Sequence, residues 1–406
     1  MNTSFLRISV AVFLLSVVYA AAQQEDPSTP PNPAVRTEIA TTEAVLPKLA
    51  DRAAGQYLLA TDYAALGDSE KALALLKQAV ESDEGFDPSA DRAFAPLKTN
   101  SGFQALVKRA AQKYPAVHRA QLAFTVAEND LIPEGLATNA SGDVFYLGSL
   151  HRRKIVQIRN GATSDFVPSD RYDLLPVLGM KVDPEDHSLW ANTGADSTGK
   201  SELVHFDATG KLLGRWAPPG DGKHLLNDLV LRGNREIYLT DSLANEAYRF
   251  DRETHSFTPL KLSRPLYYPN GIASSASGDL VFIADAFGVL RHDPKAGTSS
   301  EVIPGKAATL AGVDGMYWDR GWLVVVQNGI GLPRLARFQL SADGARVTES
   351  EILEYRSDFV ELPTTGAIAK GKFYFICNSQ LDNLRDEKIV DPSKVQPVRI
   401  GVVSLP

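Results

Sequence analysis

The sequence predicts a mainly β protein, a six-bladed β-propeller preceded by a small N-terminal α-helical module. Three observations support this prediction. A strand-rich unit recurs six times, the segment before these repeats has a helical composition, and the first residues form an apolar targeting segment. The chain of 406 residues is 44% hydrophobic and 22% charged. It is therefore too apolar for a disordered protein and long enough for a large core.

Residues 1–22 are predicted to be a signal peptide. One positive charge, Arg7, precedes an apolar run, and Ala20 and Ala22 supply the small residues of a cleavage site. The alternative is an uncleaved membrane anchor, but the run is shorter than the ~20 residues that a span requires. We therefore expect an exported protein, periplasmic or secreted, with no membrane span after the signal is cleaved.

Residues 23–36 are rich in Pro and polar side chains, so we expect an extended linker. Residues 37–118 have the composition of a helical module. Small and apolar residues within it follow the spacing of one tetratricopeptide repeat, namely Ala60, Tyr63, Gly67, Ala72, Leu76 and Ala79. A lone repeat cannot bury its apolar face. The module is therefore either a groove for a protein partner or a structural appendage that packs on the next domain.

Residues 119–406 are predicted to form the propeller. Each of the six copies contains a short loop, a strand of small residues, a polar turn and a strongly apolar strand. We aligned the copies on the residue before a Gly, or before Asp228 in the third copy. The aligned residues are Glu134, Leu178, Asn227, Asn270, Asp314 and Thr365. Their mean period of about 46 residues is typical of propeller blades and fits a pair of β-sandwiches poorly.

The last copy reaches the end of the chain with only three strands. Residues 121–127, with the sequence QLAFTVA, lie before the first copy and belong to no complete blade. We expect this segment to supply the missing outer strand of blade six. That arrangement would close the ring without a covalent link and would leave no open sheet edge.

The aligned residues point to a cation site. The first strand of each blade lines the central channel, so equivalent positions form a ring at one end of it. Turn preferences explain an Asn or Asp taken singly, but they do not explain Glu134. Two carboxylates and two amides on one axis form an oxygen-only site. We therefore expect a bound divalent ion, with Ca²⁺ the preferred candidate.

Charge and cysteine content exclude other classes. The net charge is −7 and no Lys/Arg block is present, so we expect no nucleic-acid partner. The single cysteine, Cys377, rules out an intrachain disulfide and any multi-cysteine zinc or iron–sulfur site.

Four short motifs fall in the right blades and order: PEG at 133–135, ND at 227–228, PNG at 269–271 and VDGM at 313–316. With YLTDS after the second of them, they resemble the senescence-marker-protein/gluconolactonase family of six-bladed propellers, which is regucalcin-like and similar to the paraoxonases. The resemblance implies a calcium-assisted hydrolase of lactones or related esters. It also implies that Glu134, Asn270 and Asp314 bind the metal, and that Asn227 contacts the substrate or a metal-bound water.

One departure from that family bears on the substrate. Sugar lactonases carry an arginine two residues before the blade-three asparagine, and Leu225 stands there in this chain. A residue that would grip sugar hydroxyls or a carboxylate is therefore missing. A more apolar lactone or ester fits as well as gluconolactone does.

The expected catalytic residues are Asp314, as general base, and Asn227, which would orient water or substrate. His224 lies three residues before Asn227 and is a candidate for substrate binding or proton transfer. Asp241 and Ser242 are predicted to form a turn and not part of a catalytic triad, because the sequence shows no histidine to complete one. The alternative function is a non-catalytic metal-binding propeller that binds a ligand or protein, with the helical module recruiting the partner.

Overall fold

The structure, a computed structural model, describes residues 33–194, 196–306 and 308–406. The predicted signal peptide and most of the predicted linker lie outside this range. The first helix begins at Pro33, so the last residues of the segment expected to be an extended linker are helical instead. Within the described chain, no helix is long and apolar enough to cross a membrane.

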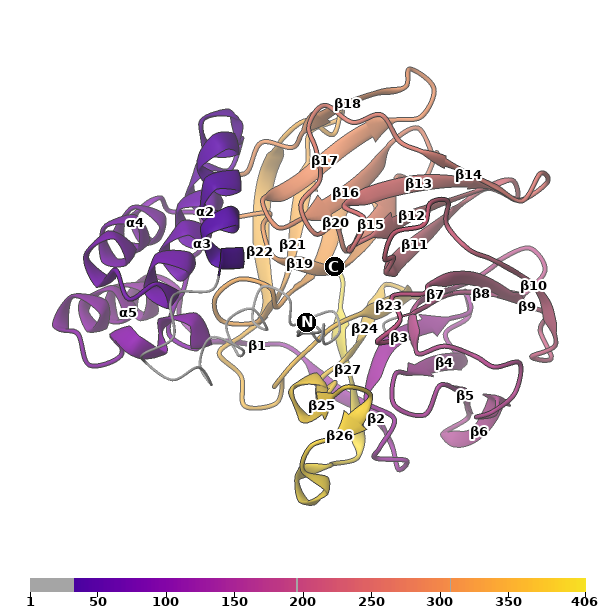
Figure 1. Ribbon diagram of the computed structural model, residues 1–406. Coiled ribbons are helices and arrows are strands. Elements are labelled where there is room, and N and C mark those ends of the chain that lie inside the picture. Colours follow the sequence, from indigo (N-terminus) through magenta and orange to yellow (C-terminus); the bar gives the residue numbers. More distant parts are fainter. Residues whose placement is uncertain (1–32, 195, 307) are drawn as a thin grey trace, which may run out of the picture.

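The β part of the chain is a closed ring of six antiparallel sheets, which confirms the six-bladed β-propeller (Figure 1). The innermost strand of each blade contacts the innermost strand of the next, and the last contacts the first. These innermost strands are β3 (Pro133–Thr138), β7 (Val177–Val182), β11 (Leu226–Arg232), β15 (Ile272–Ser274), β19 (Val313–Asp319) and β23 (Gly366–Ala369).

The second strands are almost wholly apolar and buried, because each is covered on both faces by neighbouring blades. They are β4 (Val144–Ser149), β8 (Leu189–Thr193), β12 (Glu236–Asp241), β16 (Val281–Asp285), β20 (Trp322–Gln327) and β24 (Lys372–Ile376). The outer strands of blades one to five are more polar, as their exposed faces require. They are β5 (Ile155–Arg159), β6 (Ala162–Val167), β9 (Glu202–Phe206), β10 (Leu212–Trp216), β13 (Glu246–Asp251), β14 (Ser256–Pro259), β17 (Gly288–Asp293), β18 (Thr298–Glu301), β21 (Arg334–Leu340) and β22 (Val347–Tyr355).

The ring closes as predicted. Strand β2 (Gln121–Val126) pairs antiparallel with β27 (Val398–Ser404) and forms the outermost strand of blade six. The preceding short strand β1 (Val117–His118) adds a fifth strand to blade five by pairing with β22. The two ends of the propeller are thus held by backbone hydrogen bonds rather than by a covalent bond.

Blade six carries an insertion between β24 and β27. It contains a 3₁₀ turn, a small hairpin and a second 3₁₀ turn: η3 (Leu381–Asn383), β25 (Leu384–Arg385), β26 (Lys388–Ile389) and η4 (Pro392–Lys394). Buried Leu381 belongs to an apolar cluster with Leu178 and Leu225. The insertion is therefore anchored near the channel mouth.

The helical segments are few and short, so a tetratricopeptide-like module is not evident. They are α2 (Pro33–Val45), η1 (Leu46–Lys48), α3 (Arg52–Ala65), α4 (Ser69–Glu81), η2 (Arg92–Leu97) and α5 (Ser101–Lys113). Asp51 and Asp68 cap α3 and α4 by accepting from backbone amides. The helices pack on one side of blade five (Figure 1), and their apolar core includes Ala311 and Ile330 of the propeller.

We predict that a disulfide across the closing strand stabilises the whole ring. Gln121 and Val402 are direct antiparallel partners on β2 and β27. Replacing both with Cys and oxidising the pair should raise the free energy of unfolding by about 2–4 kcal/mol, because it constrains a very long loop in the unfolded chain. The melting temperatures of the oxidised and the reduced variant are compared. Equal melting temperatures would contradict closure through β2.

Candidate functional site

The aligned residues lie where the innermost strands begin, and in four blades a β-bulge coincides with them. The register between first and second strand shifts at residues 134–135, 178–179, 227–228 and 314–315. A bulge bends its strand and redirects a side chain. The repeated motif is therefore a bulge motif that redirects the ring side chains.

The glycine after each ring residue is required because adjacent innermost strands approach each other closely there, and not because the backbone turns. Gly135, Gly179 and Gly271 are not among the residues with positive φ. A Cβ on Gly135 would lie 1.9 Å from the backbone oxygen of Leu178, and one on Gly271 would lie 2.3 Å from that of Asp314. Each of these oxygens belongs to the ring residue of the next blade. The glycines therefore let adjacent innermost strands touch, which brings the ring side chains together.

Two predicted ligands, Glu134 and Asp314, lie in the centre of this ring. Each side chain is 1% exposed. Burial raises the pKa of Glu134 well above its usual value, and the nearby charge of Asp314 raises it further. Burial likewise raises the pKa of Asp314 to about 7, although hydrogen bonds from Asn328 and Asn270 oppose the rise. The two carboxyls are close enough to disfavour each other's charge.

The donor set fits a hard divalent cation. Within the described chain, four buried oxygens at the ring have no hydrogen-bond partner: Glu134 Oε2, Asp228 Oδ2, Asn270 Oδ1 and Asp314 Oδ1. A buried polar atom without a partner costs ~1–3 kcal/mol, and more when it is charged. Carboxylate and amide oxygens are the ligands that Ca²⁺ prefers. A cation held by Glu134, Asn270 and Asp314 would remove this cost for three of the four atoms.

Asp228 is a neighbour of the site that the sequence analysis did not assign to it. Its charge raises the pKa of both Glu134 and Asp314. Lys181 donates to its Oδ1 at 3.0 Å, so this carboxylate is already paired. Its other oxygen, Oδ2, has no partner among the described residues, and no group of three or more His, Cys, Asp or Glu side chains that could hold a metal is found there. The available signal was that Asp228 is the one charged residue at the repeat's Gly position.

Asn328 is a second residue that the sequence analysis missed. It follows β20, and its Nδ2 donates to Asp314 Oδ2 at 2.5 Å and to the backbone oxygen of Pro363 at 2.7 Å. This contact fixes the Asp314 carboxyl and leaves Oδ1 without a partner. The only signal in the sequence was a polar residue directly after a strongly apolar strand.

Asn227 is held in place by blade three. It is buried, and its Nδ2 donates to Ser242 Oγ at 3.0 Å. Ser242 in turn donates to the backbone oxygen of Pro269 at 2.6 Å. Because Pro269 precedes Asn270, this chain of hydrogen bonds links two ring residues of adjacent blades. Ser242 thus positions Asn227, and it is more than the turn residue that the sequence suggested.

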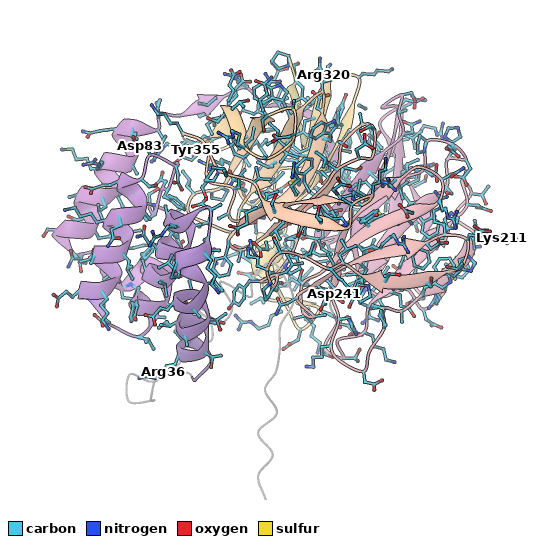
Figure 2. All side chains as sticks on the ribbon, turned by 90° about the horizontal axis from the view of Figure 1, so that it is seen from above. Arg36, Asp83, Lys211, Asp241, Arg320 and Tyr355 are labelled. Atoms are coloured by element: carbon cyan, nitrogen blue, oxygen red, sulfur yellow. The ribbon has the colours of Figure 1, made fainter. Side chains whose placement is uncertain are left out.

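His224 and Asp241 form a buried pair that was not expected. The Nδ1 of His224 lies 2.6 Å from Asp241 Oδ2, while Asp241 Oδ1 accepts from the backbone amides of Leu225 and Ala244. The Nε2 of His224 is buried and has no partner among the described residues. Asp241, labelled in Figure 2, therefore holds the imidazole of His224 so that its Nε2 is available to accept a proton. The reading of Asp241 as a simple turn residue was incomplete.

A buried apolar cluster lies beside the ring. Leu178 and Leu225 are almost completely buried and share a cluster with Ile132, Leu150 and Leu381. Leu225, for which the resemblance implied an arginine in sugar lactonases, is thus part of a buried apolar cluster in this chain. Thr365, the last ring residue, donates its hydroxyl to the backbone oxygen of Glu134, so it ties blade six to blade one.

A cavity of about 970 Å³ opens next to the ring. Its lining includes Asn270, Asp314 and Asn328 from the site. Glu134, Asn227 and His224 are not among its lining residues. The structure therefore brings two of the three predicted ligands to the cavity surface and keeps the third away from it.

Comparison with known proteins adds similarity in fold. No protein-family model matches the chain, and no curated protein matches it either. Among solved structures, a gluconolactonase from Xanthomonas campestris is similar at 15% identity, with 72% of this chain and 99% of that chain covered and a TM-score of 0.49. The PQQ-bound aldose sugar dehydrogenase from Streptomyces coelicolor is similar at 14% identity, with 71% and 99% covered and a TM-score of 0.49. These likenesses carry no argument about the activity of this chain.

We predict that stability without metal falls as pH rises. The pKa of Asp314 is raised to about 7 in the folded protein, so folding takes up a proton between its ordinary pKa and about 7. With chelator, the melting temperature should fall between pH 5 and pH 8. Ca²⁺ should reverse the fall at pH 8 and have little effect at pH 5, because the ion competes with the proton.

The control is Asp314→Asn, which removes this proton and should reduce the pH dependence in chelator without abolishing it, because burial also raises the pKa of Glu134. Ca²⁺ at 100 times its Kd would add about 2.7 kcal/mol to the free energy of unfolding of the wild-type protein. Equal Ca²⁺ shifts at pH 5 and pH 8, or a wild-type profile identical to that of Asp314→Asn, would contradict the assignment.

Proposed function

We propose that this protein is an exported, calcium-dependent hydrolase of lactones or related esters. The observation that carries the proposal is the set of buried, unpartnered oxygens of Glu134, Asn270 and Asp314. Two of these residues line a cavity large enough for a small-molecule substrate. Leu362, which packs on the apolar cluster of Leu225, also lines the cavity, and this favours an apolar lactone or ester over a sugar lactone.

Glu134, Asn270 and Asp314 would hold the divalent cation. When bound there, such an ion supplies an electrophile for a carbonyl oxygen and stabilises the negative charge that develops on it. Asn328 keeps Asp314 Oδ2 occupied, so Oδ1 is the atom free to accept. Asn227, fixed through Ser242, orients the substrate or the attacking water.

Two groups compete for the role of general base. Asp314 is at the cavity surface, but ligation to a cation lowers a carboxylate's pKa and makes it a weak base. His224 is held by Asp241 with Nε2 unpartnered, which is the arrangement of an oriented histidine base. We assign the role first to Asp314 and retain His224 as the substrate-binding or proton-transfer residue to be tested against it.

The alternative proposal is a non-catalytic metal-binding propeller that binds a ligand or protein, with the helical module contacting the partner. A site of the same three ligands would then stabilise the ring without turnover. The lining of the cavity by Asp314 and Asn270 favours the enzyme, because a purely structural ion does not need to be reached from a cavity.

We predict metal-dependent turnover in a panel of γ- and δ-lactones and phenyl esters. Each compound is assayed with saturating Ca²⁺ and again with chelator. The hydrolase proposal requires turnover of at least one compound that chelator abolishes and added Ca²⁺ restores. Bound metal by elemental analysis, together with no turnover of any compound, would favour the binding alternative.

We further predict that Asp314→Asn and Glu134→Gln differ in rescue by Ca²⁺. Both should weaken metal binding, but only the first removes the proposed base, which typically contributes 10²–10⁴-fold. High Ca²⁺ should therefore restore much of the rate in Glu134→Gln and little in Asp314→Asn. Equal rescue would make Asp314 a ligand only.

His224→Gln tests the competing base, with His151→Gln as the matched control. The Nδ1 of His151 lies 2.9 Å from the backbone oxygen of Glu387 in the blade-six insertion, and His151 is not among the residues that line the cavity. If His224 is the base, His224→Gln should lose at least 10²-fold in kcat, even at saturating Ca²⁺. His151→Gln should keep wild-type rates. An unchanged kcat in His224→Gln would remove His224 from proton transfer.

A further inference from the structure

We infer that the helical module forms one wall of the substrate cavity, and that this cavity accepts an uncharged, largely apolar lactone or ester bigger than a single ring. The inference rests on the proposed function, because it places the reacting carbonyl at Asp314 and Asn270. It gives the module a role in substrate recognition that neither the sequence analysis nor the comparisons assigned.

Three parts of the chain surround the cavity. Its floor comes from blades four and five, and includes Asn270, Asp314 and Asn328. One wall comes from the helical module, through Tyr57, Leu58 and residues 90–93. The opposite wall comes from the blade-six insertion, including residues 390–394. The three parts are far apart in sequence, so the cavity exists only when the module is docked.

The module is docked by directional contacts. Asp87 accepts from Tyr355 and Arg356 of blade five, and its backbone oxygen accepts from the Leu332 amide at 3.0 Å. Figure 2 shows Tyr355 at the junction between the helices and the propeller. The buried guanidinium of Arg334 donates to the Gly85 backbone oxygen at 3.0 Å. Each bond forms at only one placement of the module, so the wall is fixed relative to the floor.

The wall itself is also held. Tyr57 is fully buried and donates to Asp91 Oδ2 at 2.9 Å, while Asp91 Oδ1 accepts from the Ala93 amide. Arg92 then reaches across to Asp382 of the insertion, at 3.2 Å. This ion pair joins the two walls of the cavity.

The charges of the lining argue against an anionic substrate. Six lining residues are acidic, namely Asp91, Asp285, Asp314, Glu361, Asp382 and Asp391, and two are basic. Both basic residues are paired already, Arg92 with Asp382 and Lys394 with Asp391. Two of the acidic residues are paired as well, Asp285 with Arg264 and Glu361 with Arg399. Away from the proposed cation, a carboxylate on the substrate would therefore find both basic side chains of the lining already paired.

The size and the apolar lining of the cavity indicate what the substrate carries beyond its reacting carbonyl group. The volume of about 970 Å³ is at the upper end of the range for small-molecule sites. Leu58, Ile330, Pro333, Leu362 and Val390 give the space between the walls an apolar surface. An alkyl or aryl extension of a lactone or ester fits that surface, and would lie against the helical module.

The test narrows the cavity from the module side. Ala90 is exposed and lines the cavity, whereas Ala111 on α5 is exposed and does not. Ala90→Trp is compared with the matched control Ala111→Trp. The ligand is N-octyl-2-pyrrolidone, an uncharged lactam that resists hydrolysis, and Kd is measured by calorimetry with Ca²⁺ present. We expect Ala90→Trp to weaken binding at least tenfold and Ala111→Trp to leave it unchanged.

Catalysis provides a separate readout. In Ala90→Trp the KM for 4-nitrophenyl octanoate should rise at least fivefold more than the KM for the small ester phenyl acetate, while Ala111→Trp keeps wild-type kinetics on both esters. No binding of the lactam to wild type, or equal binding by Ala90→Trp, overturns the inference even if esters are hydrolysed. Binding that depends on Ala90, with no turnover of any ester, leaves the cavity assignment standing and rejects the proposed hydrolase.

The charge preference is tested with two ligands of the same shape. 2-Oxopyrrolidine-1-acetamide is uncharged, and 2-oxopyrrolidine-1-acetate carries one negative charge. We expect the amide to bind wild type at least tenfold more tightly than the carboxylate does. Equal affinity, or preference for the carboxylate, would overturn the assignment of an uncharged substrate.

Discussion

The rest of this structure depends on the contact between adjacent innermost strands at the repeated glycines. A Cβ at Gly135 or Gly271 would clash with the backbone of the next blade, so these positions set how narrow the ring is. A narrow ring forces the side chains one residue earlier in the sequence to converge. The same contact that closes the propeller therefore places Glu134 and Asp314 together, where their charges oppose each other. Stability of the metal-free ring and formation of the cation site are thus in conflict.

The surrounding hydrogen bonds do not remove this electrostatic repulsion, because they leave several of the buried oxygens without a donor. Asn328 satisfies one oxygen of Asp314, and Lys181 satisfies one oxygen of Asp228. The remaining oxygens of Glu134, Asn270 and Asp314 stay without partners in the described chain. A residue that donated to them would stabilise the fold but occupy the positions that a cation requires. Unpartnered buried atoms are few in native proteins, and a bound ion is one of the explanations for them.

Much of the fold could be predicted from the sequence because propeller repeats are local. Each repeat of about 46 residues contains both the apolar segment of the second strand and the ring residue, so both can be found from the repeat period. The closing strand could also be predicted. The segment that forms β2 precedes the first blade and belongs to no complete blade, and the last copy of the repeat has only three strands. The ring residues followed from the same alignment, although the reason for the glycines proved to be close approach and not turn geometry.

The parts that were missed depend on contacts between distant or irregular segments. His224 and Asp241 meet because a bulged strand and the end of the next strand lie side by side, which no local pattern records. Asn328 follows an ordinary strand, and nothing near it in the sequence indicates a contact with Asp314. The helical module has its own apolar pattern, which suggested a repeat. That pattern gave no indication that Ala311 and Ile330 of the propeller complete its core.

The junction between module and propeller explains why the module can serve as a wall. An apolar interface alone would tolerate sliding, since hydrophobic contact is non-directional. Here, buried polar groups cross the junction. Asp51 accepts from Thr309 at 2.7 Å and is hydrogen-bonded to Glu84, whose pKa burial raises to about 9.

Asp51 and Glu84 both belong to the helical module, and Thr309 of the propeller binds both of them. Its hydroxyl donates to the Asp51 carboxylate, and its amide donates to the Glu84 backbone oxygen at 2.7 Å. Such contacts are satisfied at one orientation only. A cavity whose floor and wall belong to separate parts of the chain needs that constraint, because a small rotation of the module would change the distance between the wall and Asp314.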